Sequence, residues 1–104
     1  MASTKITWDN FEQEVIQSDK TVLIDFWAAW CGPCQMLSPF IEEVAAEMPE
    51  IKVCKVNVDE EPELTSRFGV MNIPMLVVMK DGKIVNQSVG FQGKEQIKNL
   101  VTGF

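Results

Sequence analysis

Along the chain, segments in which nearly every residue is apolar or β-branched alternate with segments in which apolar residues recur three and four positions apart. The first kind predicts strands, and residues 21–27 and 51–58 have the continuous apolar character of strands buried on both faces of a parallel sheet. Residues 75–79 and 84–89 predict two further strands. The Asp-Gly pair within residues 80–83 predicts a tight hairpin between these last two strands.

The second kind of segment predicts helices, which begin near residue 9 and cover residues 34–48, 59–68 and 94–101. Asp9 and Glu12 have the spacing of a capping box, with Trp8, Phe11 and Val15 on one helical face. Asp59 is expected to cap the third helix, and Pro39 is expected to kink the second helix near its first turns. The sequence also allows a short edge strand near Lys5-Ile6, ahead of the first helix.

The order of these elements predicts an α/β fold. Strands that alternate with helices favour a mostly parallel sheet, and the hairpin adds an antiparallel edge. A chain of 104 residues has room for one hydrophobic core, and it shows no repeat, low-complexity tract or linker. We therefore expect a single domain over residues 1–104.

Charge and composition exclude several functions. The net charge of −6 argues against nucleic-acid binding, because an acidic surface repels phosphate groups. The sequence contains no histidine, which removes the commonest general base and metal ligand. No apolar run is long enough to span a bilayer, and residues 1–8 contain no apolar signal core. We expect a monomeric cytoplasmic protein without membrane contacts, although a trimmed export signal would leave the same sequence.

Cys31 and Cys34 are separated by Gly32 and Pro33, and this spacing is open to three interpretations. A structural zinc site needs four ligands, and the chain offers three cysteines and no histidine, although two chains could share a metal through their pairs. A structural disulfide would close a very short ring, for which the chain-entropy estimate is only about 2 kcal/mol. The third interpretation is redox chemistry, without a bound metal or cofactor.

Position in the predicted fold favours the redox interpretation. The pair follows the strand at residues 21–27 and opens a helix, and reaction sites in α/β sheets gather at the carboxyl ends of strands. Unpaired N–H groups at a helix start stabilise a thiolate, the form that attacks disulfides. Cys31 is therefore the expected nucleophile, and Cys34, one turn later, is expected to be more buried. Cys54, on a predicted buried strand, is interpreted as a core residue.

Four stretches of the chain resemble the thioredoxin family in order and spacing: "VLIDFWAAWCGPC", "KVNVDEEP", "FGVMNIPMLVVMKDGK" and "VGFQGKEQIKNLV". The Cys-Gly-Pro-Cys stretch is specific because Phe-Trp-Ala-x-Trp precedes it, whereas Cys-x-x-Cys alone is a weaker signal. The resemblance covers most of the chain. It implies a thioredoxin fold, with a central mixed, mostly parallel five-stranded sheet flanked by four helices.

The resemblance also implies an activity, the reduction of disulfides in target proteins. Cys31 attacks the target disulfide, Cys34 releases the target from the mixed disulfide, and a flavoprotein thioredoxin reductase reduces the Cys31–Cys34 disulfide that remains. The implied partners are this thioredoxin reductase and disulfide-containing target proteins. The implied chemistry needs no bound cofactor.

Asp25 lies inside the predicted strand at residues 21–27, with apolar residues on both faces of that strand. A buried carboxyl group has a raised pKa, which makes it a plausible base for Cys34. The resemblance implies this role for Asp25 and places Lys55 near it. The alternatives are a solvent-facing aspartate and an ordinary surface lysine.

The resemblance implies a substrate-binding surface around the cysteine pair, made of Trp30, Gly32, Pro33, Ile73, Pro74 and Gly90. The Ile73–Pro74 bond is expected to be cis and to lie opposite the cysteines. The backbone of Ile73 would then pair with an extended substrate segment. A plain turn glycine is the alternative for Gly90.

The chain departs from the commonest family pattern at Ala29, Gln35, Met75 and Met79. Because Gln35 supplies no cation, the thiolate of Cys31 is expected to be slightly less stabilised than it would be beside a lysine. Met36, Met71 and Met75 are expected to form a soft apolar rim around the site, or else to belong to the core.

Two rival functions remain open from the sequence. One is a disulfide oxidant or isomerase, which differs from a reductase in reduction potential. The other is a non-catalytic binding subunit with the thioredoxin fold. Gly32 and Pro33 between the cysteines resemble the reducing members of the family, and an intact pair beside Asp25 counts against a binding subunit.

Overall fold

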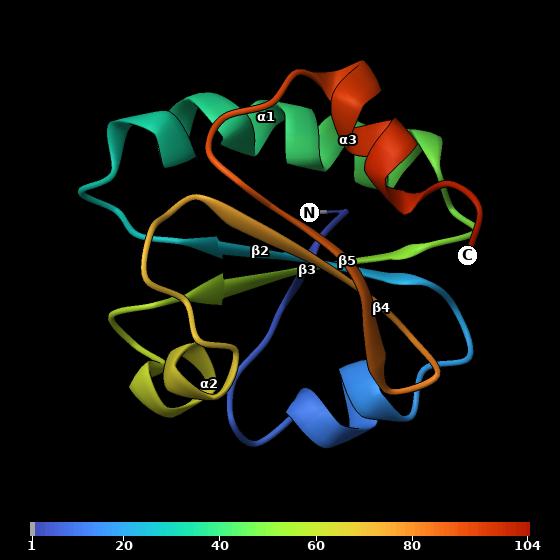
Figure 1. Ribbon diagram of the computed structural model, residues 1–104, viewed down its shortest axis with the longest axis horizontal. Coiled ribbons are helices and arrows are strands. Elements are labelled where there is room, and N and C mark those ends of the chain that lie inside the picture. The colour runs from blue at the N-terminus through green and yellow to red at the C-terminus, as the bar shows by residue number, and fades with distance from the viewer. Residues whose placement is uncertain (1) are drawn as a thin grey trace.

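The computed structural model describes residues 2–104 and shows a five-stranded sheet between two helical layers (Figure 1). Helices α1 and α3 cover one face of the sheet, whereas α2 and the short π-helical segment η1 cover the other. The elements in chain order are β1 (Thr4–Lys5), η1 (Glu12–Ile16), β2 (Val22–Trp27), α1 (Gly32–Glu47), β3 (Lys52–Asn57), α2 (Pro62–Arg67), β4 (Met75–Lys80), β5 (Lys83–Val89) and α3 (Lys94–Val101). No helix among residues 2–104 is both long enough and apolar enough to cross a membrane.

The strand order in the sheet is β1-β3-β2-β4-β5. The pairs β1–β3 and β3–β2 are parallel, whereas β2–β4 and β4–β5 are antiparallel, so the prediction of a mostly parallel sheet is wrong in its pairings. The antiparallel strand is not at an edge but lies between β2 and β5. After α2 the chain stays at the carboxyl end of β2, where Met75 pairs with Phe26, and β4 must therefore run back along β2.

The core consists of two layers, one on each face of the sheet. On the side of η1 and α2, the side chains of Ile24 and Phe26 from β2 pack with Val15 and Leu64. On the side of α1 and α3, Leu23 packs with another cluster, whose buried members include Leu37, Ile41, Val44, Leu76, Val78 and Ile97. Strand β2 is thus covered on both faces, as its continuous apolar sequence predicts.

The first helical segment begins later than expected. Its first residue is Glu12, with Phe11 as N-cap and no capping side chain, so the predicted Asp9–Glu12 capping box is wrong. The side chain of Asn10 takes over the local bonding, because it accepts the N–H of Thr7 and donates to the carbonyl of Lys5. Trp8 lies half exposed rather than in the core.

The predicted cap of the third helix is also wrong. Helix α2 begins at Pro62 after Glu61, which makes no capping bond. The side chain of Asn57, at the end of β3, accepts the N–H groups of Asp59 and Glu60 instead. Asp59 is thereby freed for a contact at the functional site.

Helix α1 begins at Gly32 and runs unbroken through Pro39 to Glu47. Its N-cap is Cys31, in an extended conformation that turns the chain from the β2 loop into the helix. The expected kink at Pro39 stays a prediction.

The hairpin between β4 and β5 forms as the sequence predicts. Asp81 and Gly82 both have positive φ, at 52° and 77°, as in a type I′ turn. Aspartate tolerates this conformation and glycine favours it, which explains the strength of the Asp-Gly signal.

Candidate active site

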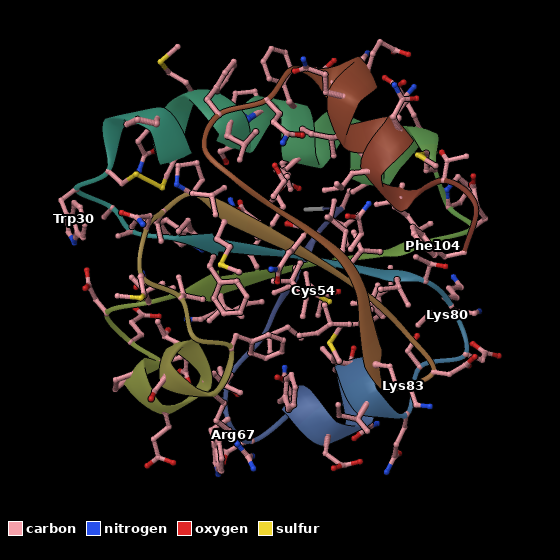
Figure 2. All side chains as sticks on the ribbon, in the orientation of Figure 1. Trp30, Cys54, Arg67, Lys80, Lys83 and Phe104 are labelled. Atoms are coloured by element: carbon pink, nitrogen blue, oxygen red, sulfur yellow. A yellow bond between two sulfur atoms is a disulfide. The ribbon has the colours of Figure 1, made fainter. Side chains whose placement is uncertain are left out.

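The cysteine pair lies where the loop after β2 enters α1. Cys31 and Cys34 form a disulfide, with their Cα atoms 5.2 Å apart, so the two sulfur atoms are in direct contact. The remaining cysteine, Cys54, lies fully buried in β3 near the centre of the sheet (Figure 2), where burial raises its pKa to about 12. It is a core residue, as predicted.

Cys31 occupies the position where a helix start acts on a sulfur atom. As the N-cap of α1, its Sγ accepts the backbone N–H of Cys34 at 3.3 Å. This bond and the positive end of the helix dipole both favour a negative charge on Cys31. In the disulfide both residues are buried, with 5% of Cys31 and 2% of Cys34 exposed, so their neighbours distinguish them better than their burial does.

The neighbours of Cys31 belong to the outer rim of the site. Its Sγ lies 3.9 Å from the carbonyl oxygen of Ile73, and the bond between Ile73 and Pro74 is cis, as the resemblance implies. Trp30, which is 71% exposed, extends from the same end of the sheet (Figure 2). Its Nε1 donates a hydrogen bond to Asp59 at 2.8 Å, so the indole is fixed despite its exposure.

Gly90 and the methionines define how open this rim is. Gly90 has a φ of +100°, donates its N–H to the carbonyl of Pro74 at 2.8 Å, and leaves open space where a side chain would stand. Met36 and Met71 are exposed, as expected for rim residues. Met75 is buried, so the core alternative holds for it, because the first residue of β4 faces the core layer of η1 and α2.

The neighbours of Cys34 line an open surface pocket of about 420 Å³ beside the disulfide. Trp27, Ser38 and Lys55 are among the residues that line this pocket. The Lys55 ammonium donates to Ser38 Oγ at 2.9 Å and lies 5.0 Å from the centre of the Trp27 ring. Only 14% of the Lys55 side chain is exposed, so the alternative that Lys55 is an ordinary surface lysine is wrong.

Asp25 is fully buried, and within residues 2–104 neither of its carboxylate oxygens has a hydrogen-bond partner. It lies beside Lys55 in the register of β2 and β3. Burial raises the pKa of Asp25 from 3.8 to about 7; the positive charge of Lys55 opposes this shift and the negative charge of Glu42 adds to it. A pKa in this range lies far closer to neutral pH than that of an exposed aspartate.

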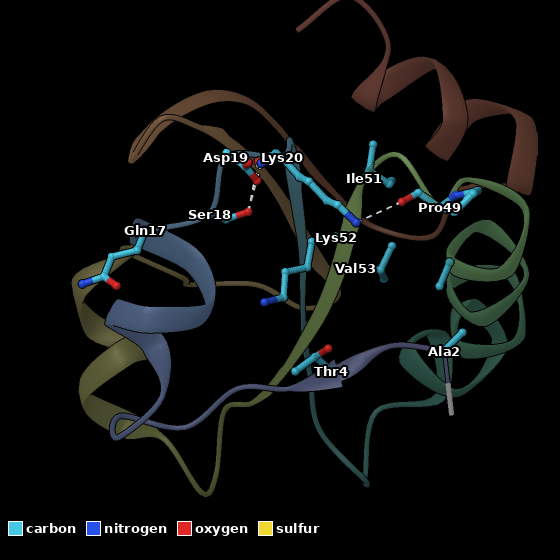
Figure 3. A pocket seen from close by; sticks show the side chains of 11 residues that line it. Ala2, Thr4, Gln17, Ser18, Asp19, Lys20, Pro49, Ile51, Lys52 and Val53 are labelled. Carbon is cyan, nitrogen blue, oxygen red and sulfur yellow. Dashed lines mark hydrogen bonds between the residues drawn. The ribbon is translucent and has the colours of Figure 1, made fainter.

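A larger cleft, of about 590 Å³, lies away from the cysteines between the η1–β2 loop and the start of β3 (Figure 3). Its two cations are already engaged, since Lys20 donates to the carbonyl of Pro49 at 3.2 Å and Lys52 binds Glu14 at 2.5 Å. The cleft therefore adds nothing to the chemistry of the disulfide.

Three residues at the site were not foreseen: Ser38, Glu42 and Asp59. Ser38 and Glu42 follow Cys34 at intervals of four residues, which places all three on one face of α1. This spacing in the sequence could have predicted that Ser38 and Glu42 lie on the same helix face as Cys34. The contact of Asp59 with Trp30 depends on the hydrogen bonds that Asn57 makes, and no local sequence pattern predicts it.

Comparison with known proteins agrees with this geometry. The sequence profile of the thioredoxin family matches residues 2–103. Thioredoxin of Alicyclobacillus acidocaldarius subsp. acidocaldarius is 53% identical over 98 residues, covering 93% of this chain and 92% of that protein. Thioredoxin of Bacillus subtilis (strain 168) is 48% identical over 102 residues, covering 97% and 96%. The fold and the cysteine pair thus define a thiol–disulfide oxidoreductase that reduces protein disulfides. The chain belongs to the thioredoxin family.

The Gln35 side chain offers a direct test of the charge around Cys31. Its amide donates to the carbonyl of Ala29 at 3.1 Å, on the first turn of α1. We expect a Gln35→Lys variant to be alkylated at Cys31 with a pH midpoint lower by several tenths of a unit, because a cation there stabilises the thiolate. The measurement is the iodoacetamide rate of the reduced protein against pH. Equal pH midpoints in the parent and the Gln35→Lys variant would contradict this expectation.

Proposed function

We propose that Cys31 is the nucleophile, Cys34 the resolving thiol and Asp25 the base of the reductase. The observation that carries the proposal is the division of the site into two sides. Cys31 accepts a helix N–H and lies beside Ile73 on the outer rim, whereas Cys34 lines a separate pocket with Lys55. A target can approach the first sulfur, and a proton can leave from the second.

Two thiol–disulfide exchanges complete the reaction. The thiolate of Cys31 attacks one sulfur of the target disulfide, so that a mixed disulfide forms and the other target sulfur leaves as a thiolate. Cys34 then loses its proton and attacks the Sγ of Cys31. The second target thiolate leaves, and the intramolecular disulfide has formed. Two electrons have passed from the cysteine pair to the target.

Asp25 suits the second exchange because its pKa of about 7 leaves it partly ionised at neutral pH. It can accept the proton of Cys34 and lose it again between turnovers. Lys55, its neighbour on β3, tunes this acceptor through its positive charge.

Target binding is assigned to the rim of the site. The backbone of Ile73 would pair with an extended segment of the target, with Pro74 fixing the direction of that backbone. Trp30 would supply an exposed aromatic surface, and the missing side chains of Gly32 and Gly90 would allow close approach. Pro33, exposed in the first turn of α1, belongs to the same surface.

The cellular partners follow from the need for turnover. We assign the return of two electrons to a thioredoxin reductase, and the substrates to disulfide-containing proteins of the cytoplasm. The protein would act as a monomer and a single domain, since one dithiol and one docking rim suffice for the exchange.

A trapping experiment tests these roles. A Cys34→Ser variant should accumulate a covalent adduct with insulin, because the mixed disulfide at Cys31 cannot be resolved. Mass spectrometry should place the adduct on Cys31, and dithiothreitol should release it. The Cys31→Ser variant is the matched control and should form no adduct. An adduct on Cys34 in that control, with none on Cys31 in the first variant, would reverse the two roles.

A further inference from the structure

A line of polar contacts joins the N-terminal segment to Lys55. The N–H and the hydroxyl of Ser3 donate to the carboxylate of Glu42, at 3.1 and 2.5 Å. The oxygen that accepts from the Ser3 hydroxyl, Glu42 Oε2, also lies 4.0 Å from Lys55 Nζ. Ser38, one turn earlier in α1, accepts from the same ammonium at 2.9 Å. Lys55 is therefore held from the side of α1.

This arrangement leaves an expected ion pair unformed. Asp25 and Lys55 are register partners on adjacent parallel strands, so their side chains emerge on the same face of the sheet. The ammonium nevertheless bonds to Ser38 and lies over Trp27, while the Asp25 oxygens have no hydrogen-bond partner among the described residues. The contacts with α1 hold the cation away from the one buried carboxylate.

We propose that Glu42 is a positioning residue for the release step, because it holds the Lys55 ammonium on the α1 side and so leaves Asp25 free to accept the proton of Cys34. The inference rests on the proposed function of Asp25. It adds a role for a glutamate that touches neither the target nor the cysteines. Ser3 and Ser38 support the role by orienting the carboxylate and the ammonium.

The charged groups around Asp25 give the direction of the effect. The charge of Lys55 acts on it from β3 and that of Glu42 from α1, and its partner on β4 is the apolar Leu76. Lys5, which lines the surface pocket beside Cys34, is paired with Glu60 at 3.3 Å. Loss of the Glu42 charge would leave Lys55 unopposed and free to turn toward Asp25. Both consequences lower the pKa of Asp25.

The direct test is a carbon-13 NMR titration of the Asp25 carboxyl group in the oxidised protein, where Cys34 does not titrate. Glu42→Gln should lower the Asp25 midpoint by at least several tenths of a pH unit. Glu43→Gln is the matched control, because it removes the same charge from a residue that faces Lys94 of α3 at 3.2 Å. The Asp25 midpoint in this variant should match that of the parent. Glu42→Asp keeps the negative charge, so the Asp25 midpoint in this variant should lie close to that of the parent. An unchanged midpoint in Glu42→Gln overturns the inference.

A second measurement separates this inference from the proposed function. The rate at which the mixed disulfide is resolved should depend on the ionisation of Asp25. The pH midpoint of this rate should therefore fall in Glu42→Gln by the same amount as the NMR midpoint of Asp25. An NMR midpoint that moves while the release profile stays in place would show that Asp25 is not the base. The proposed function would then fail, and the release role of Glu42 would fail with it.

Discussion

Replacement of Cys31 by serine is expected to reduce the rate of insulin disulfide reduction by on the order of 10³-fold or more. A serine hydroxyl does not ionise near neutral pH, so the hydrogen bond from Cys34 N–H and the helix dipole have no thiolate to stabilise. Cys34 is not expected to substitute for it, because Cys34 is buried and lies inside the first turn of α1 and not at the N-cap. The rate is measured as NADPH oxidation in the presence of a thioredoxin reductase, and separately with dithiothreitol as the reductant.

The matched control removes the third sulfur atom. A Cys54→Ala variant loses a core sulfur that takes no part in the site and should reduce insulin at the parent rate. If the Cys31→Ser variant instead keeps the parent rate with both reductants, Cys31 is not the attacking group and the assigned mechanism fails.

Replacement of Asp25 by asparagine is expected to stabilise the protein, and increasingly so as the pH rises. The folded protein holds the pKa of Asp25 at about 7, against 3.8 in the unfolded chain. The folded state therefore binds the proton more tightly than the unfolded state, and its stability falls as the pH rises from about 4 through about 7. Asparagine carries no charge at any of these pH values and is free of this loss.

The size of the effect follows from the shift. A difference of about 3 pKa units corresponds to about 4 kcal/mol, so the free energy of unfolding of Asp25→Asn relative to the parent should increase by about that amount between pH 4 and pH 8. Urea denaturation of both oxidised proteins at several pH values measures it. A difference between parent and Asp25→Asn that is constant with pH would mean that folding does not raise the pKa of Asp25.

Much of the scaffold follows from local sequence patterns. The continuous apolar run of β2 predicts its burial on both faces, and Asp25 within it is consequently the polar residue that breaks the pattern. The Asp81-Gly82 pair predicts the hairpin because few other residue pairs accept two positive φ values. The position of Cys31 at the start of α1 could be predicted because strand and helix periodicities change at that point.

Other features depend on contacts between distant segments and could not be predicted. The caps at Asn10 and Asn57 replace those expected at Asp9 and Asp59, because side-chain bonds to nearby turns compete with simple capping. The position of β4 between β2 and β5 is set by where α2 returns the chain. The Glu42–Lys55 contact requires three elements to be in place, and Ser3 lies 39 positions from its partner.

The burial of Cys54 within the sheet has a consequence for the reaction of the protein with oxidants. Cys54 is fully enclosed and burial keeps its thiol protonated, whereas reactive cysteines are accessible thiolates. We therefore expect oxidised glutathione to act on Cys31 and Cys34 and to leave Cys54 of the folded protein unmodified.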